Sequence, residues 1–156
     1  MEKKDNLTKT LAVAGTTLIL MAVIAPIFFS ITALISSGRF VFDFIMPAEL
    51  FPLVLIGSAL LIFAAVRAKS RRKLIIWSFA IGTAMLFGGQ ALAVATGLAS
   101  GEIEPTGIWW GLTLGSLIVF DLAVVATCVG GFLLIVDLYK RPALSLIHIS
   151  EPTRPY

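Results

Sequence analysis

Residues 105–136 read PTGIWWGLTLGSLIVFDLAVVATCVGGFLLIV, with Asp121 as the only charged residue in the run. About 20 apolar residues in a helix cross a hydrocarbon core about 30 Å thick. This stretch is long enough to do so, and it therefore predicts a membrane-spanning helix. Its aspartate lies near the middle of that helix, where an acid is least expected.

Three other runs repeat the pattern without any charge. They lie between Lys9 and Arg39, from Leu50 to Val66 and from Leu74 to Gly101. We expect helices at about 11–35, 48–66, 74–98 and 108–136. The second run rises only about 25 Å, because each helical residue adds about 1.5 Å. Arg67 and Lys69 can extend it by reaching toward the headgroups.

The composition agrees with a chain that uses lipid as much of its solvent. It is 58% hydrophobic and 13% charged, with a mean hydropathy of +1.00. Soluble domains are about 25% charged, and a chain of this size leaves much of its surface exposed. The predicted fold class is all-α, a four-helix transmembrane bundle forming one domain over residues 1–143.

The first run has a second interpretation, as a secretory signal peptide. It follows three lysines, and Ile31–Ala33 loosely resembles a cleavage site. However, the apolar run is much longer than the 7–15 residues of a signal peptide core. An uncleaved helix is therefore favoured.

Basic residues are distributed very unevenly among the connecting segments. One side collects ten of them, and the other holds Arg39 alone together with Asp43, Glu49, Glu102 and Glu104. The ten are Lys3, Lys4, Lys9, Arg67, Lys69, Arg71, Arg72, Lys73, Lys140 and Arg141. Lys and Arg are enriched in short cytoplasmic loops. We therefore expect a cytoplasmic N-terminus and a cytoplasmic end of the fourth helix.

The same distribution argues against nucleic acid as a partner, despite a net charge of +3. Residues 67–73 read RAKSRRK, a short basic turn held between two helices. Its expected role is to determine topology and to contact anionic lipid headgroups of the bilayer.

The last thirteen residues resemble something other than a protein family. Residues 144–156 read LSLIHISEPTRPY. The codons CTG-TCT-CTT-ATA-CAC-ATC would give Leu144–Ile149, and TCC-GAG-CCC-ACG-AGA would give Ser150–Arg154. This resembles the translation of a transposase adapter used in sequencing libraries. The resemblance implies a non-native tail, a native chain that continues differently after about residue 143, and no native histidine, because His148 lies here. Residues 1–143 show no resemblance to a family that we recognise.

Asp121 is the main candidate for a functional residue. A mid-membrane aspartate costs at least about 2.5–3.5 kcal/mol on insertion scales, so it should face protein or water. Two roles are open: a proton or cation site or docking contact, and a protonated, hydrogen-bonded structural residue. The predicted third helix carries Thr83, Gln90 and Gly97 at seven-residue spacing, with Leu86 and Ala93 between them. We expect Gln90 to be the nearest partner for Asp121.

The fourth helix also carries small residues on one face, which lies roughly opposite Asp121. They are Gly111, Gly115, Ala123, Ala126 and Gly130. Gly111 and Gly115 have the GxxxG spacing that permits close helix approach. The helix is therefore expected to need neighbours on two sides.

Catalysis has little support in this sequence. With His148 excluded there is no histidine for acid–base chemistry or metal binding, and no cofactor or metal site is predicted. Cys128, the single cysteine, suits a small packing residue. Two hypotheses remain. The first is a non-catalytic interaction or accessory subunit, which associates through the fourth helix with a second copy, as a homo-oligomer, or with a membrane-protein partner. The second is a subunit of a proton- or ion-coupled transporter or channel that uses Asp121. The small size and short basic turn favour a bacterial plasma membrane. The sequence identifies no specific activity.

Overall fold

The computed structural model is all-α over the residues it describes, which are 2–37, 50–102, 104 and 106–147. These residues form four helices: α1 (Glu2–Ser37), α2 (Phe51–Ala68), α3 (Arg72–Ala95) and α4 (Gly107–Ile147). Each one is long and apolar enough to cross a membrane. The predicted fold class, a four-helix transmembrane bundle, is thus confirmed. Arg39, Asp43 and Glu49 lie outside the described residues.

The helices follow the charge-free runs but two of them extend well past those runs. α1 begins at Glu2 and not near residue 11, and α4 continues to Ile147 and not to about 136. Hydropathy marks where a helix enters the lipid, whereas a helix ends only where its backbone hydrogen bonds end. Polar residues that form helix well, such as lysine, therefore carry both helices beyond the apolar segment.

α4 includes residues 144–147, the first four residues of the segment that resembles adapter sequence. We expect a clone made from genomic DNA to diverge from this sequence at about Leu144. Deleting residues 144–156 should change neither membrane insertion nor stability, because the segment contains no apolar run long enough to span a bilayer. Finding the same codons in the chromosome of the source organism would refute the adapter interpretation.

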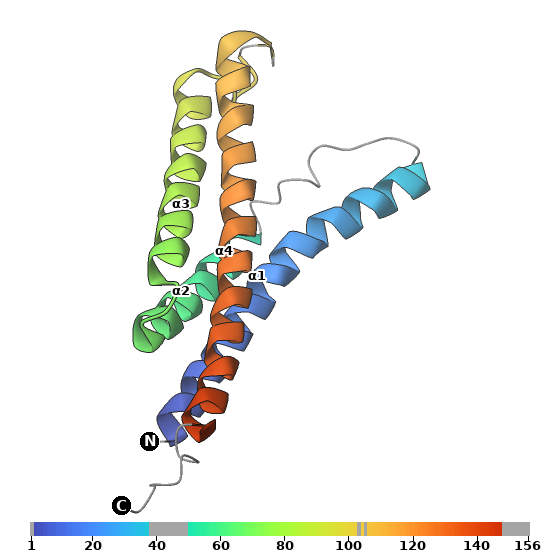
Figure 1. Cartoon of the computed structure of the whole chain (residues 1–156). Coiled ribbons are helices and arrows are strands. Elements are labelled where there is room, and N and C mark those ends of the chain that lie inside the picture. Colours follow the sequence, from blue (N-terminus) through green and yellow to red (C-terminus); the bar gives the residue numbers. More distant parts are fainter. Residues whose placement is uncertain (1, 38–49, 103, 105, 148–156) are drawn as a thin grey trace, which may run out of the picture.

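α3 packs along its length against the N-terminal part of α4 as an antiparallel pair, and α4 continues beyond it (Figure 1). A Cβ added at Gly82 would lie 3.1 Å from Ala123 Cβ, and one at Gly130 would lie 2.9 Å from Ile75 Cγ1. A Cβ at Gly89 would overlap the Ser116 hydroxyl. These three contacts are seven residues apart on each helix, which is the 3.5-residue periodicity of coiled coils.

α1 and α2 form a second pair, joined at a crossing where two glycines meet. A Cβ at Gly57 would lie 2.8 Å from Ile19 Cγ1 and 3.0 Å from the Gly15 carbonyl oxygen. α4 reaches the same point, since a Cβ at Gly131 would lie 3.0 Å from Leu61 Cδ1. Leu61 and Ile19 are fully buried there. Glycine therefore brings three backbones together at the centre of the bundle.

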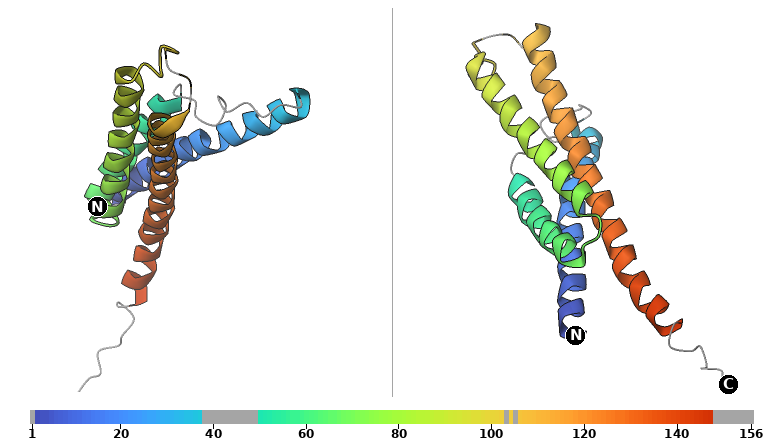
Figure 2. Two further views of the ribbon diagram at one scale, coloured as in Figure 1. Left: turned by 90° about the horizontal axis from the view of Figure 1, so that it is seen from above. Right: turned by 60° about the vertical axis from the view of Figure 1, so that its left-hand side comes forward.

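The second half of α1 points away from this centre (Figures 1 and 2). Ala22 is buried, and none of residues 23–36 is. Pro26 lies inside the helix and removes one backbone donor just after that point. The bundle is therefore closed around Gly57 and open toward the C-terminal end of α1.

Candidate functional site

Asp121 lies in a row of α4 residues spaced three and four apart, here called the Asp121 row. Its members are Leu117, Asp121, Val124, Cys128, Gly131, Ile135 and Leu138. Val124, Cys128 and Leu138 belong to the core that also contains Ala12 and Ile19 of α1. The row is thus the side of α4 that faces the closed part of the bundle.

Close packing along this row ends at Asp121. Val124 and Cys128 are buried, whereas Asp121 and Leu117 are only half-buried. α1 packs against the members of the row that follow Asp121 in the sequence, and it diverges from α4 after Ala22. Among the described residues, the Asp121 carboxylate has no hydrogen-bond or ion-pair partner. The acid thus lies at the edge of the packed region, on a surface that the described part of the chain leaves half open.

The expected hydrogen bond between Gln90 and Asp121 is not formed among the described residues. The side of α3 that contacts α4 carries Gly82 and Gly89, so Gln90 lies one residue farther round and is exposed. α3 also packs on the side of α4 opposite Asp121. Gln90 therefore lies outside the face of α3 that contacts α4. That face, in turn, contacts the side of α4 opposite Asp121.

The other members of the predicted α3 row differ in their surroundings. Leu86 and Ala93 are buried as expected. Thr83 is half-buried, and its hydroxyl oxygen has no hydrogen-bond partner among the described residues. It lines a small cavity of about 10 Å³ beside Phe51 and Phe120. That space is about the minimum for one water molecule, so it offers no room for a substrate.

The small-residue face of α4 is divided in two by the structure. Ala123 and Gly130 are buried against α3, and Ala126 is half-buried. Gly111 and Gly115, the GxxxG pair, have no atom of the described chain within 4 Å of where a Cβ would lie. The half of α4 that begins at Gly107, here called the outer half, therefore presents open helix surface at this pair and, on another side, at Asp121.

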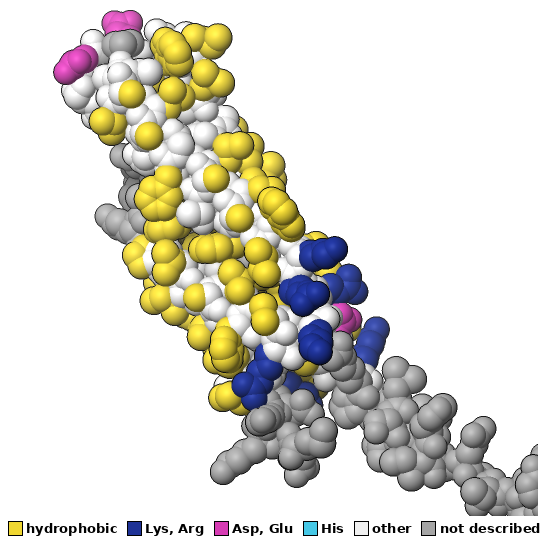
Figure 3. Space-filling model, turned by 90° about the vertical axis from the view of Figure 1, so that its left-hand side faces the viewer, with side chains coloured by type: hydrophobic (Ala, Val, Ile, Leu, Met, Phe, Trp, Pro, Cys, Tyr) yellow, Lys and Arg dark blue, Asp and Glu magenta, His cyan; other side chains and the backbone are white. Residues whose placement is uncertain are grey.

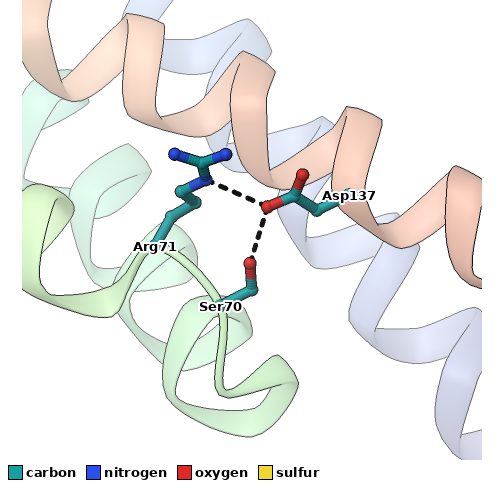
Figure 4. Close-up of polar contacts among 3 residues, drawn as sticks. All are labelled: Ser70, Arg71 and Asp137. Atoms are coloured by element: carbon teal, nitrogen blue, oxygen red, sulfur yellow. Dashed lines mark hydrogen bonds and ion pairs between the residues drawn. The ribbon is translucent and has the colours of Figure 1, made fainter.

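The basic turn lies against the end of α4. The side chains of Arg67, Lys69, Arg71, Arg72 and Lys73 are exposed. Arg71 Nε donates to Asp137 Oδ2 at 3.0 Å, and Ser70 Oγ donates to the same oxygen at 2.8 Å (Figure 4). Lys69 and Arg71 both adopt positive φ angles, 53° and 54°, which turns the chain tightly between α2 and α3. Asp137 thus fixes the turn to α4.

The charges of the described chain are separated along its length. Figure 3 shows the basic side chains gathered at one end, with one acid among them, and acidic side chains at the other end. Glu102 and Glu104 are the exposed acids after α3. The start of α1, the α2–α3 turn and the end of α4 share the basic end (Figure 1). The structure therefore brings together the basic segments that the sequence places on one side.

The described residues contain no group of His, Cys, Asp and Glu that could hold a metal ion. Cys128 is buried in the core. Comparison with protein-family models, with curated proteins and with solved structures finds no match.

Sequence reasoning missed the glycines that hold α1, α2 and α4 together. Gly15, Gly57 and Gly131 are each close to atoms of another helix. A spacing rule such as GxxxG cannot find them, because none of them has another glycine four residues away on its own helix and each meets a glycine or a larger side chain on another helix. The Arg71–Asp137 pair was missed for a similar reason, since it joins residues far apart in the sequence.

Proposed function

We propose that this chain is a small, non-catalytic plasma membrane protein that acts by associating with another membrane chain, either a second copy or a partner. The association surface is the outer half of α4 on the side of Asp121. The observation that carries the proposal is Asp121, half-buried in a packing row whose cover ends beside it.

Energetics favour a protein neighbour over lipid at this position. A carboxyl group facing hydrocarbon costs at least about 2.5–3.5 kcal/mol near the middle of a helix. A neighbouring helix that offers a hydroxyl, amide or backbone donor removes much of that cost. The open Gly111–Gly115 pair, on a different side of α4, offers a surface on which a second helix can approach closely.

The charge distribution supports an orientation with the basic end in the cytoplasm. The start of α1, the α2–α3 turn and the end of α4 then lie on the cytoplasmic side, where Lys and Arg accumulate. The acidic end, with Glu102 and Glu104, faces outward. The outer half of α4 is then the half nearer the outer leaflet.

A transporter or channel subunit is the second candidate, because a membrane carboxyl group can carry a proton or bind a cation. The half-open position of Asp121 is compatible with this role. The apolar cavity beside Thr83 gives little support to a transport role, because its volume is only about 10 Å³.

The two roles predict different behaviour of Asp121 variants. The test compares oligomeric state, in vesicles at a matched protein-to-lipid ratio, for wild type, Asp121→Asn and Asp121→Leu. We expect Asp121→Leu to weaken association at least about threefold, because interhelical hydrogen bonds average about 0.6 kcal/mol and reach about 1.7 kcal/mol. Asp121→Asn should retain most of the association. Phe63→Ala is the control, since Phe63 lies on another helix, α2, and is 56% exposed.

The same preparation distinguishes the alternatives. Equal, monomeric behaviour of all variants, in vesicles and with native-membrane components added, would remove the association proposal. Loss of proton-driven flux in both Asp121 variants, with association unchanged, would support the transporter instead.

A further inference from the structure

A groove of about 430 Å³ lies between the first turns of α1 and the end of α4. Its lining residues are Asn6, Lys9, Thr10, Val13, Ala14 and Tyr139. It is at the basic end of the molecule, far along α4 from Asp121, and is separate from the proposed association surface.

One wall of the groove is polar and carries a positive charge. The Lys9 ammonium lies 5.2 Å from the centre of the Tyr139 ring. A cation held over an aromatic face is oriented by the ring. Asn6 lies about one turn before Lys9 on α1 and Thr10 directly follows Lys9, and both are exposed. The Lys9 ammonium and the Asn6 side-chain amide can donate hydrogen bonds to the oxygens of an anion, whereas the Thr10 hydroxyl donates to the Asn6 carbonyl oxygen at 3.0 Å.

The floor of the groove is apolar and continues along α1. Val13 and Ala14 are exposed beside the polar wall. Further along the same helix face, Met21 is 59% exposed and Ile24 is 52% exposed. A largely apolar strip, interrupted by Thr17, whose hydroxyl donates to the Val13 carbonyl oxygen, therefore leads from the charged wall toward the middle of the predicted membrane span.

We propose that this groove binds an anionic phospholipid of the leaflet that faces the basic end. Its phosphate-bearing headgroup lies against Lys9, Asn6 and Thr10, and an acyl chain follows the strip from Val13 past Met21. A ligand for this groove has to be anionic at one end and a long apolar chain at the other. Basic pockets between membrane helices on the cytoplasmic side are where anionic headgroups bind.

Native mass spectrometry of the full chain, released from vesicles of phosphatidylcholine with phosphatidylglycerol, tests this site. The variants are Lys9→Gln and, as a control, Lys140→Gln, which removes the same charge from an exposed residue that does not line the groove. We expect wild type to retain phosphatidylglycerol in preference to phosphatidylcholine. Lys9→Gln should lower that preference about fivefold, as one basic residue near an anionic surface contributes about that factor, and Lys140→Gln should leave it nearly unchanged.

Two results would overturn the proposal. Equal losses in both variants would show a general effect of surface charge and no groove site. Displacement of the lipid by millimolar inorganic phosphate would show that the groove recognises a free anion and not a membrane lipid. Replacing Met21 by asparagine adds an independent test, because it should weaken retention by interrupting the apolar strip while leaving the charged wall intact.

Discussion

Replacing Gly57 by valine should be among the most destabilising single substitutions in this chain. The new side chain would meet Ile19 at 2.8 Å and the Gly15 carbonyl oxygen at 3.0 Å, in a region where Ile19 and Leu61 are fully buried. Overpacking of this kind typically costs about 1–3 kcal/mol, and here a backbone must shift as well. We expect the free energy of unfolding in mixed detergent micelles to fall by at least that amount.

Gly88→Val is the matched control for this prediction. It places the same branched side chain in a helix, and a Cβ at Gly88 would have no neighbour within 4 Å. The two variants therefore share the change in helix propensity and differ only in packing. Equal stabilities of Gly57→Val and Gly88→Val would contradict the close crossing of α1 and α2.

The orientation proposal predicts an all-or-none labelling result. Single cysteines are placed at Ser70, in the basic turn, and at Ser100, after α3, with Cys128 replaced by alanine. A membrane-impermeant thiol reagent should label Ser100→Cys in intact cells, because the acidic end is expected to face outward. It should label Ser70→Cys only after permeabilisation.

The permeabilised sample also shows whether each cysteine is reactive, since Ser70 is half-buried and bonded to Asp137. Labelling of Ser70→Cys in intact cells, with Ser100→Cys protected, would reverse the orientation. Labelling of both would contradict an odd number of spans between them.

The positions of the helices could be predicted because a charged residue is costly in hydrocarbon. Charge-free runs such as Leu50–Val66 therefore locate the spans directly. The ends of the helices could not be predicted in the same way, as the extension of α1 back to Glu2 shows. Outside the lipid, helix formation depends on local backbone bonding, which hydropathy does not report.

The neighbours of each helix were predicted less well. Small residues indicated that α4 packs closely on another helix, and Ala123 and Gly130 do so against α3. The same reasoning failed for Gln90, because α3 carries more than one set of residues with seven-residue spacing, and each set lies on a different face. Which face is used depends on the partner surface, here Gly82 and Gly89 opposite Ala123 and Ser116.

The most direct test of the association surface is photo-cross-linking in the native membrane. A photoreactive side chain at Leu117, one turn from Asp121 in the Asp121 row, is compared with one at Phe63, which is 56% exposed on α2. If another chain covers the outer half of α4, Leu117 should yield a defined protein–protein adduct, reduced in Asp121→Leu, whereas Phe63 should yield mainly lipid adducts. Lipid adducts alone at both positions would contradict the proposal that this surface binds a membrane protein.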